Sequence, residues 1–261
     1  AIIIIFFFII IKIIGLNLSR KLFAFIFIKI GPLFKSRNTI DNNLEKYLNI
    51  YNMDNKKKII LKMWSNYGKT FVEYLFLKRF RNKNNHIKIK GEKILNKIIK
   101  NNKPVIFVSG HFANFELMSM ELTKKNIKVA TIYRPLNNFF LNPFMEYFRR
   151  SYVCRNQIKK GLAGLKTSIN YIKKNYSIAL MIDQRLSEGK KLPFFNHNAS
   201  TTTLPAQLAL KYNLDIVPIY ISRNNNNTFE MEIFEPIDLF DGKESEKNKL
   251  AISLSLNKII E

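Results

Sequence analysis

The sequence predicts an α/β protein in which a mostly parallel central sheet is flanked by helices and preceded by an N-terminal membrane helix. After residue 100, short apolar runs alternate with stretches of helical periodicity, which is typical of a parallel sheet covered by helices. Hydrophobic residues make up 47% of the 261 residues, enough for a large core. Residues 1–16 carry a single charge, on Lys12.

Residues 1–34 are predicted to form helices that anchor the chain to a membrane or lie in its interface. A spanning helix needs about 20 apolar residues, so we expect residues before Ala1 to complete the first apolar run. Ser19 is expected to cap a second helix, residues 20–30, which ends at the Gly-Pro pair that follows. This second helix suits a membrane interface and a protein core equally well. Basic residues after the first run predict that the rest of the chain is cytoplasmic.

The second predicted domain covers residues 35–261. It begins with helices between residues 41 and 77, interrupted by loops at 52–54 and 66–68. The periodicity then predicts strands at 86–91, 105–109, 127–133, 177–182, 215–222 and 228–234, and helices at 92–101, 114–125, 142–150, 162–174 and 204–212. The chain ends within a further helical pattern, so we expect its C-terminus to be truncated.

Polar side chains follow several of these strands. His111 comes just after the second strand, Arg134 after the third, and Asp183 and Gln184 after the fourth. Because the carboxyl ends of parallel strands meet at one edge of a sheet, and sites in such folds form there, we expect these residues to lie at a functional site.

Basic residues strongly outnumber acidic ones. Lys and Arg number 43 and Asp and Glu 19, which gives a formal net charge of +24. This charge predicts an anionic partner, such as nucleic acid, an anionic membrane surface or an acidic carrier protein. The joint abundance of Ile, Lys and Asn indicates that genome composition contributes to its size. The single cysteine, Cys154, excludes an intramolecular disulfide and metal sites built on several cysteines.

The segment VSGHFANFELM joins a strand end to the start of a helix and places His111 five residues before Glu116. Imidazole titrates near neutral pH and can act as a general base. A carboxylate bonded to its other ring nitrogen would fix the tautomer. Because no nucleophilic serine accompanies the pair, the hydroxyl to be activated is expected to belong to the substrate. The alternative is a histidine with a purely structural role.

At this point the sequence resembles a known family. GHFANFE resembles the H-x4-D/E motif of the lysophospholipid acyltransferase superfamily, and more narrowly the GHxGNWE form of the bacterial lipid A biosynthesis acyltransferases of the lauroyl/myristoyl type. Two further blocks of that family follow in order, VATIYRPLNNFFLNPFMEYFRR and IALMIDQRLSEGKKLPFFNHNASTTTLPAQLAL. In these motifs Phe115 replaces a usual Trp. Asn196 replaces a usual Gly, and asparagine tolerates a left-handed backbone.

The resemblance implies a membrane-bound O-acyltransferase with no metal or organic cofactor and no nucleic-acid partner. It would move a fatty acyl chain from acyl carrier protein to a hydroxyl of an anionic lipid A precursor, on the cytoplasmic face of the bacterial inner membrane. His111 would be the general base and Glu116 its partner, and Arg150 is preferred to Arg149 as the catalytic arginine. Substrate-binding roles are expected for Asn114, Arg134, Arg149, Asp183 and Gln184.

Three other functions stay open. The chain could acylate a lysophospholipid, although DQRLSEG stands where glycerophosphate-type members carry an EGTR-like block. It could acylate another glycolipid. From a different class, it could be a non-catalytic basic protein that binds membranes or nucleic acid, which explains the charge but not the three motif blocks.

Overall fold

The structure of the protein, a computed structural model, describes residues 2–35, 37–48, 51–239 and 242–261. The chain divides into two units, Ala1–Phe80 and Arg81–Glu261. The domain boundary expected after residue 34 therefore falls inside the first unit.

The first unit is helical. It contains α1 (Ile2–Phe34), α2 (Arg37–Leu48), α3 (Met53–Glu73), the 3-10 turn η1 (Tyr74–Phe76) and the first residues of α4 (Leu77–Asn82). Gly15 has a non-helical backbone (φ 77°, ψ 169°) and divides α1 into two segments. The Ser19 hydroxyl donates to the carbonyl oxygens of Ile11 (3.1 Å) and Gly15 (2.6 Å), so it bridges this break. Ser19 therefore lies inside the second segment. The prediction that it caps a helix beginning at Arg20 is wrong.

Two glycines that the sequence placed at helix ends or in loops instead lie inside helices. A Cβ atom on Gly31 would come within 2.2 Å of the Trp64 ring, and one on Gly68 within 2.2 Å of the Phe23 carbonyl oxygen. Each glycine thus permits a close approach between α1 and α3. For this reason α1 continues past Gly31 to Phe34, and α3 shows no loop at 66–68.

The predicted membrane helix is not found. Among the residues that the structure describes, none of the helices combines the length and the apolar character needed to cross a bilayer. The break at Gly15 interrupts the apolar run. In the segment that follows, the buried Arg20 guanidinium forms an ion pair with the buried carboxylate of Glu73 (2.7 Å).

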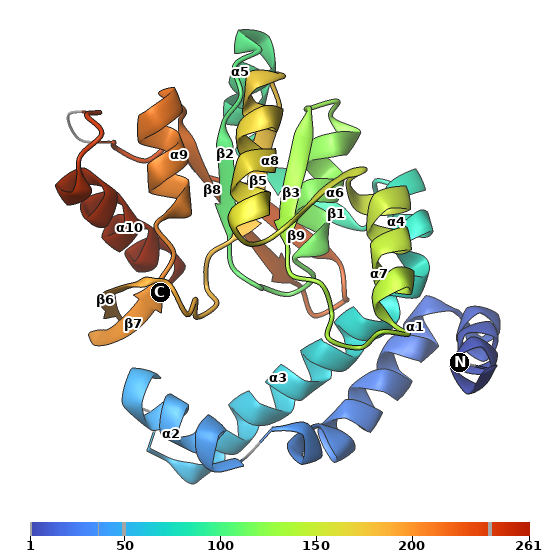
Figure 1. Ribbon diagram of the computed structural model, residues 1–261. Coiled ribbons are helices and arrows are strands. Elements are labelled where there is room, and N and C mark those ends of the chain that lie inside the picture. Colours follow the sequence, from blue (N-terminus) through green and yellow to red (C-terminus); the bar gives the residue numbers. More distant parts are fainter. Residues whose placement is uncertain (1, 36, 49–50, 240–241) are drawn as a thin grey trace. The chain divides into compact units, whose positions relative to one another are not determined.

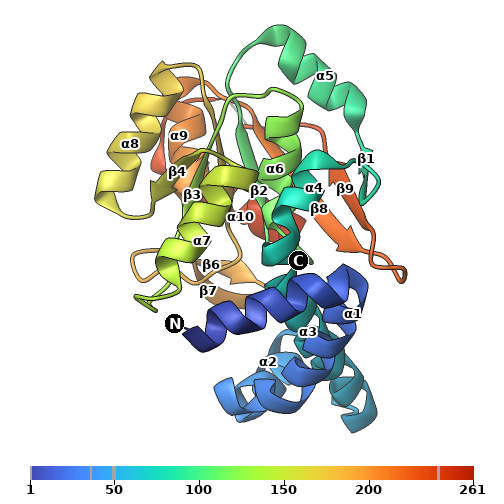
Figure 2. The ribbon, with the colours of Figure 1, turned by 90° about the vertical axis from the view of Figure 1, so that its right-hand side faces the viewer.

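The second unit contains the sheet, and Figures 1 and 2 show its strands with helices beside them. Its strands are β1 (Ile87–Lys90), β2 (Ile106–Ser109), β3 (Val129–Tyr133), β4 (Asn156–Lys159), β5 (Ser177–Met181), β6 (Lys190–Phe194), β7 (His197–Thr201), β8 (Ile216–Arg223) and β9 (Phe229–Ile233). Its helices are α5 (Glu92–Asn101), α6 (Glu116–Lys124), α7 (Asn142–Phe148), a π-helix η2 (Arg149–Val153), α8 (Leu162–Lys173), α9 (Leu204–Tyr212) and α10 (Glu246–Ile260).

Seven strands form one sheet in the order β1-β9-β8-β2-β5-β3-β4. Every neighbouring pair is parallel except β8 with β9. The prediction of an α/β fold with a mostly parallel central sheet is therefore confirmed. The central strands β2 and β5 are buried except for Met181 at the end of β5, as expected when helices cover both faces.

Alternate residues of β2 serve the two faces of this sheet. Ile106 and Val108 belong to a core cluster with apolar residues of α8, α9 and α10. The fully buried α6 side chains Leu117 and Met118 lie outside that cluster, and α6 lies against the opposite face from α8 (Figure 1). Since β2, β5, β3 and β4 run parallel, their carboxyl ends share one edge, and the residues that follow them gather there.

Two elements were not predicted from the sequence. The edge strand β4 is short and polar apart from Ile158. The antiparallel hairpin of β6 and β7 turns at Phe195 and Asn196, which have φ values of 47° and 60°. Asn196, which stands where the resembled family usually has Gly, thus has a left-handed backbone that asparagine tolerates.

Candidate active site

His111 lies just beyond the carboxyl end of β2, after a turn that small residues make possible. A Cβ atom on Gly110 would come within 2.7 Å of the Phe112 ring. Ala113 has a φ of 43°, a left-handed conformation that is unfavourable for a residue with a side chain. The Phe115 ring meets the His111 ring edge-on, with 4.6 Å between centroids. This strained turn presents the imidazole at the strand edge.

Asp183 holds His111 through two bonds. The backbone N–H of His111 donates to Asp183 Oδ2 (2.9 Å), and His111 Nδ1 lies 2.7 Å from Asp183 Oδ1. Gln184 Nε2 lies 3.3 Å from His111 Nε2. These residues meet because β2 and β5 are neighbours in the sheet, with Ser109 opposite Met181. The structure thus brings together three of the residues expected at the strand ends.

The charges of this group fix the histidine tautomer. Burial raises the pKa of the Asp183 carboxyl, but the hydrogen bonds that it accepts from the His111 ring and backbone help to hold that pKa below its ordinary value. An ionised carboxylate can only accept a hydrogen bond. When His111 is neutral, its ring hydrogen therefore lies on Nδ1, which faces Asp183. Nε2 is then left as an acceptor, which suits the Gln184 amide. The His111 side chain is 30% exposed, so a substrate can reach it.

Glu116 does not hold the position that the sequence assigned to it. The carboxylate bonded to His111 Nδ1 is that of Asp183, whereas Glu116 pairs with Arg149. Glu116 is the first residue of α6 and is buried, and its Oε1 atom accepts from Arg149 Nε (2.8 Å) and Nη2 (2.6 Å). The turn after His111 and the first residue of α6 direct Glu116 toward the interior. Asp183 reaches the imidazole because it follows β5, the strand beside β2.

The arginine that pairs with Glu116 is Arg149, and the catalytic role preferred for Arg150 stays a prediction. Arg149 is 9% exposed and its guanidinium lies 5.6 Å from the centre of the Tyr133 ring, whereas Arg150 is exposed. The π-helix that begins at Arg149 explains the choice, because its wider turn sets which side chain faces α6. The Cys154 N–H donates to the Arg149 carbonyl (2.9 Å), which closes this turn.

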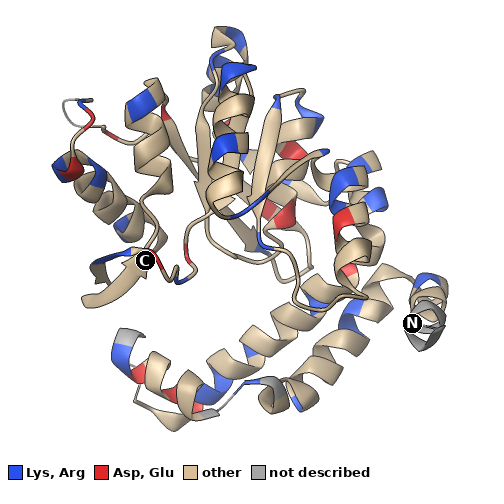
Figure 3. Cartoon of the chain, in the orientation of Figure 1, with Lys and Arg blue, Asp and Glu red and all other residues tan. Residues whose placement is uncertain are grey.

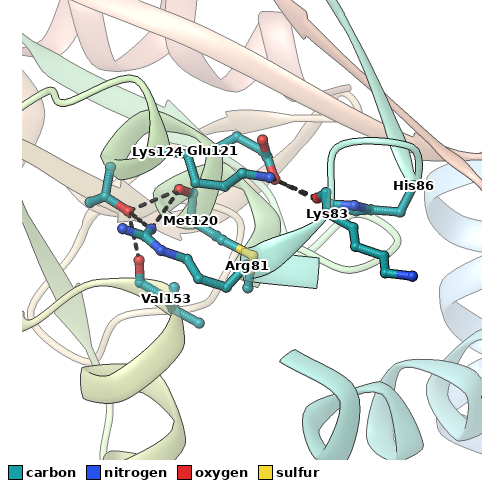
Figure 4. A network of polar contacts seen from close by, with 8 residues as sticks. Arg81, Lys83, His86, Met120, Glu121, Lys124 and Val153 are labelled. Carbon is teal, nitrogen blue, oxygen red and sulfur yellow. Dashed lines mark hydrogen bonds and ion pairs between the residues drawn. The ribbon is translucent and has the colours of Figure 1, made fainter. Parts of the chain in front are cut away.

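A second contact joins α6 to the π-helix at their other ends. The Thr123 hydroxyl donates to the Val153 carbonyl oxygen (2.9 Å) and accepts from Arg81 Nη1 (2.5 Å). Figure 4 shows Arg81 between Met120 and Val153, with Lys124 bonded to Glu121 on the same helix. With the Glu116–Arg149 pair at one end and Thr123–Val153 at the other, α6 and the π-helix form a rigid pair that fixes the guanidinium.

A network that the sequence did not reveal lies beside Arg149. The Tyr133 hydroxyl, at the end of β3, donates to Glu146 Oε1 (2.6 Å), which also accepts from Asn142 Nδ2 (2.9 Å). Burial raises the pKa of Tyr133, and its bond to Glu146 raises it further, while that same bond lowers the pKa of Glu146. The YRP block contains Tyr133. The hydrogen bond of its hydroxyl to Glu146 could not be predicted, because Glu146 lies in the next helix, α7.

The remaining predicted site residues lie near this edge in different settings. Arg134 follows β3 and is exposed, so a substrate anion can reach it. Asn114 is buried in the turn before α6, where its backbone carbonyl oxygen accepts from the Leu117 N–H (3.1 Å). Asn114 therefore supports the turn that carries His111.

The fold and the site define a class of protein. An oriented imidazole with an accepting nitrogen and an ionised aspartate behind it suit the transfer of a group to a hydroxyl. A family model described as bacterial lipid A biosynthesis acyltransferase matches residues 1–261. The chain belongs to this family, which implies an acyltransferase in lipid A biosynthesis. No curated protein was found to match the chain.

Proposed function

We propose that the protein transfers a fatty acyl chain from the thioester of acyl carrier protein to a hydroxyl of a lipid A precursor. The observation that carries this proposal is the His111 geometry. Among the described residues, the polar side chains bonded to the imidazole are Asp183 and Gln184, and neither is a hydroxyl or thiol nucleophile. The hydroxyl that His111 activates therefore comes from the substrate.

In the proposed step, His111 Nε2 takes the proton of the acceptor hydroxyl as its oxygen bonds to the thioester carbonyl carbon. The imidazolium that forms is stabilised by the Asp183 carboxylate at Nδ1. When the tetrahedral intermediate collapses, the carbon–sulfur bond breaks and the imidazolium returns the proton to the thiolate. The products are an ester and the free carrier thiol. No acyl-enzyme forms, because the acceptor hydroxyl attacks the thioester directly. The Gln184 amide would lose its bond to Nε2 as substrate enters.

Glu116 and Arg149 have a supporting role in this proposal. A guanidinium can stabilise an oxyanion or bind a phosphate through paired hydrogen bonds. Glu116 positions Arg149 and reduces its charge, so Glu116 assists His111 through the arginine and not through a direct bond. The exposed Arg134 would bind a phosphate of the lipid A precursor. The excess of basic residues suits both this anionic acceptor and an acidic carrier protein (Figure 3).

The cytoplasmic face of the bacterial inner membrane is the proposed place of this reaction. The acceptor is a lipid and carrier-bound acyl chains are cytoplasmic, so the active-site edge must reach both. Acylation of a lysophospholipid or another glycolipid would use the same histidine chemistry and is the second candidate.

The experiment uses the full chain in membranes, acyl carrier protein with a radiolabelled acyl chain and a tetra-acylated lipid A precursor. His111→Ala and Asp183→Asn are the test variants, and His197→Ala is the matched control because it removes a histidine of the β6–β7 hairpin. Label should move to the precursor with the parent and His197→Ala, and fail to move with His111→Ala. Transfer that survives His111→Ala would overturn the mechanism. Transfer only to a lysophospholipid or a glycolipid in parallel reactions would change the acceptor.

A further inference from the structure

Large apolar side chains are exposed on the segment that follows β3. Phe139 and Phe140 are 82% and 72% exposed and meet edge to face with 5.7 Å between ring centroids. Further exposed apolar side chains lie beside them in the chain, namely Leu136, Phe144 and Tyr147. We call these five residues the aromatic patch. Solvent exposure of so much aromatic surface is unfavourable, so it marks an interaction surface.

The loop that carries the patch is held in shape by its own hydrogen bonds. Asn138 Oδ1 accepts from the N–H groups of Phe140 (3.0 Å) and Leu141 (3.0 Å). Asn142 Oδ1 accepts from the Leu136 N–H (2.8 Å), which ties the start of the loop to the start of α7. The two phenylalanines are therefore presented outward by a preformed turn and do not depend on a partner to order it.

The chain around the patch is almost free of acidic residues. Between Leu122 and Ile182 the sequence contains twelve Lys and Arg residues and one acidic residue, Glu146. That carboxylate accepts from Tyr133 and lies 3.7 Å from Lys159 Nζ, so it offsets only part of the positive charge around it. Lys159 pairs with Tyr133 in the sheet and is exposed, as are Lys160 and Arg134. The patch is thus bordered by positive charge at the strand edge that carries the site.

We propose that the aromatic patch inserts into the headgroup region of an anionic bilayer, with Arg134, Lys159 and Lys160 against the lipid phosphates. This inference rests on the proposed function, since it states how the site reaches a lipid acceptor. Aromatic side chains favour the membrane interface, where apolar rings and polar headgroups are both present. Basic residues beside them complement the negative surface potential. An acidic protein partner would pair with the lysines but offers nothing specific to two adjacent phenylalanines.

A local fluorescence readout tests the proposal, and it does not depend on whether other parts of the chain also bind lipid. The chain has one tryptophan, Trp64, which is buried. Phe139→Trp adds a second at the tip of the patch. Ile99→Trp is the matched control, because Ile99 is 42% exposed near the end of α5, which leads to the amino end of β2. Both signals are read after subtraction of the parent protein.

With vesicles of phosphatidylglycerol and phosphatidylcholine, Phe139→Trp should show a blue shift and quenching by brominated acyl chains, and Ile99→Trp should show neither. Pure phosphatidylcholine vesicles should give a weaker effect. Absence of quenching at position 139 while the protein binds the vesicles would overturn the proposal. Failure of the protein to bind vesicles would also overturn the proposal. One such case is a protein that forms dimers through the patch, which Phe139→Ser with Phe140→Ser would dissociate.

The basic border has its own test in the Phe139→Trp background. Lys159→Gln with Lys160→Gln should lower partitioning into the anionic vesicles by about fivefold for each lysine at low salt. The control is Lys173→Gln with Lys174→Gln, two exposed lysines at the opposite end of α8, which should change partitioning much less. Equal effects of the two pairs would show that only total charge matters and would overturn the assigned border.

The two proposals can fail separately. Acyl transfer is also measured with the acceptor in detergent micelles, where no bilayer is present. Insertion of the patch without transfer in either system would leave this inference standing and overturn the proposed function. Transfer in micelles, with vesicle binding but without insertion of position 139, would support the proposed function and overturn this inference.

Discussion

Asp183 binds His111 at two points, one on the backbone and one on the ring. Its Oδ2 atom accepts from the His111 N–H at 2.9 Å while Oδ1 lies 2.7 Å from Nδ1. One carboxylate therefore fixes both the turn after β2 and the orientation of the imidazole. A change at Asp183 should affect the base and its placement together.

Asp183→Asn should reduce acyl transfer by roughly 10²- to 10⁴-fold, the range typical of lost general-base assistance. The amide can present its N–H₂ group to Nδ1, which favours the tautomer with the hydrogen on Nε2 and removes the acceptor that the reaction needs. The measurement is the initial rate of label transfer at saturating donor, with Gln184→Ala beside it. Because Gln184 touches Nε2 only as a displaceable donor, its loss should have a smaller effect. A rate for Asp183→Asn within about threefold of the parent would contradict this assignment.

The stability of the protein in acid should depend on the same residue. Asp183 has a pKa below its ordinary value in the folded protein, so it contributes stability above the unfolded pKa of about 3.9. That contribution is lost as the pH falls through the lower folded value. Urea unfolding at pH 7, at pH 5 and near pH 3 should show the parent losing more stability than Asp183→Asn below about pH 4. Parallel losses in the two proteins would contradict the cause given for the shifted pKa.

Glu116→Gln should destabilise the protein far more than a change at the neighbouring exposed arginine. It leaves the buried Arg149 guanidinium without this carboxylate, a situation that costs about 3–5 kcal/mol in buried ion pairs. Arg150→Gln is the matched control and should stay within about 0.5 kcal/mol of the parent. The double variant Glu116→Gln with Arg149→Met should recover much of the loss, since neither charge then remains. Urea unfolding measures all three, and equal midpoints for Glu116→Gln and Arg150→Gln would disprove the pairing as a stabilising contact.

Ala113 should accept glycine and reject a β-branched residue. A left-handed backbone costs an L-residue about 1–2 kcal/mol, and glycine avoids that penalty. Against this gain, glycine raises the entropy of the unfolded chain, which lowers stability by about 0.4–1 kcal/mol. Ala113→Gly should therefore be neutral or more stable by up to about 1 kcal/mol, and the motif form GHxGNWE has glycine at this place. Ala113→Val should lose about 1 kcal/mol or more together with transfer activity. Thermal and urea unfolding measure the stability of both variants. A less stable Ala113→Gly would contradict the claim that alanine is strained at this position.

Much of the α/β unit could be predicted from local patterns, because each buried strand is a short apolar run and each covering helix has an apolar stripe. The run before Ser109 and the periodic segment 204–212 are examples, and their predicted bounds agree with β2 and α9 to within about one residue. β4 was missed since an edge strand needs little apolar character, and only Ile158 of its four residues is buried. The pair Gly31 and Gly68 misled the prediction because glycine serves close helix packing as well as helix ends.

The sequence pointed to residues that meet at the end of β2, but not to the pairs that they form there. His111, Asp183 and Gln184 could be selected because each follows an apolar strand. That Asp183 and not Glu116 reaches the imidazole depends on β5 lying next to β2, and strand order is not written in local periodicity. That Arg149 and not Arg150 pairs with Glu116 depends on a single π-helical turn, which no composition signal marks.

The pairing of His111 with Asp183 also has a consequence for how the chain acquires activity. The two residues are 72 positions apart, and the intervening chain forms α6, β3, α7, β4, α8 and β5. Their bond is a contact of high sequence separation, so the entropy of closing this long loop must be met before it can form. The imidazole is therefore oriented only after the three crossover connections between β2 and β5 have formed. A partly synthesised chain that ends before Asp183 has the histidine without its aspartate, so activity during refolding should appear only once β5 lies beside β2.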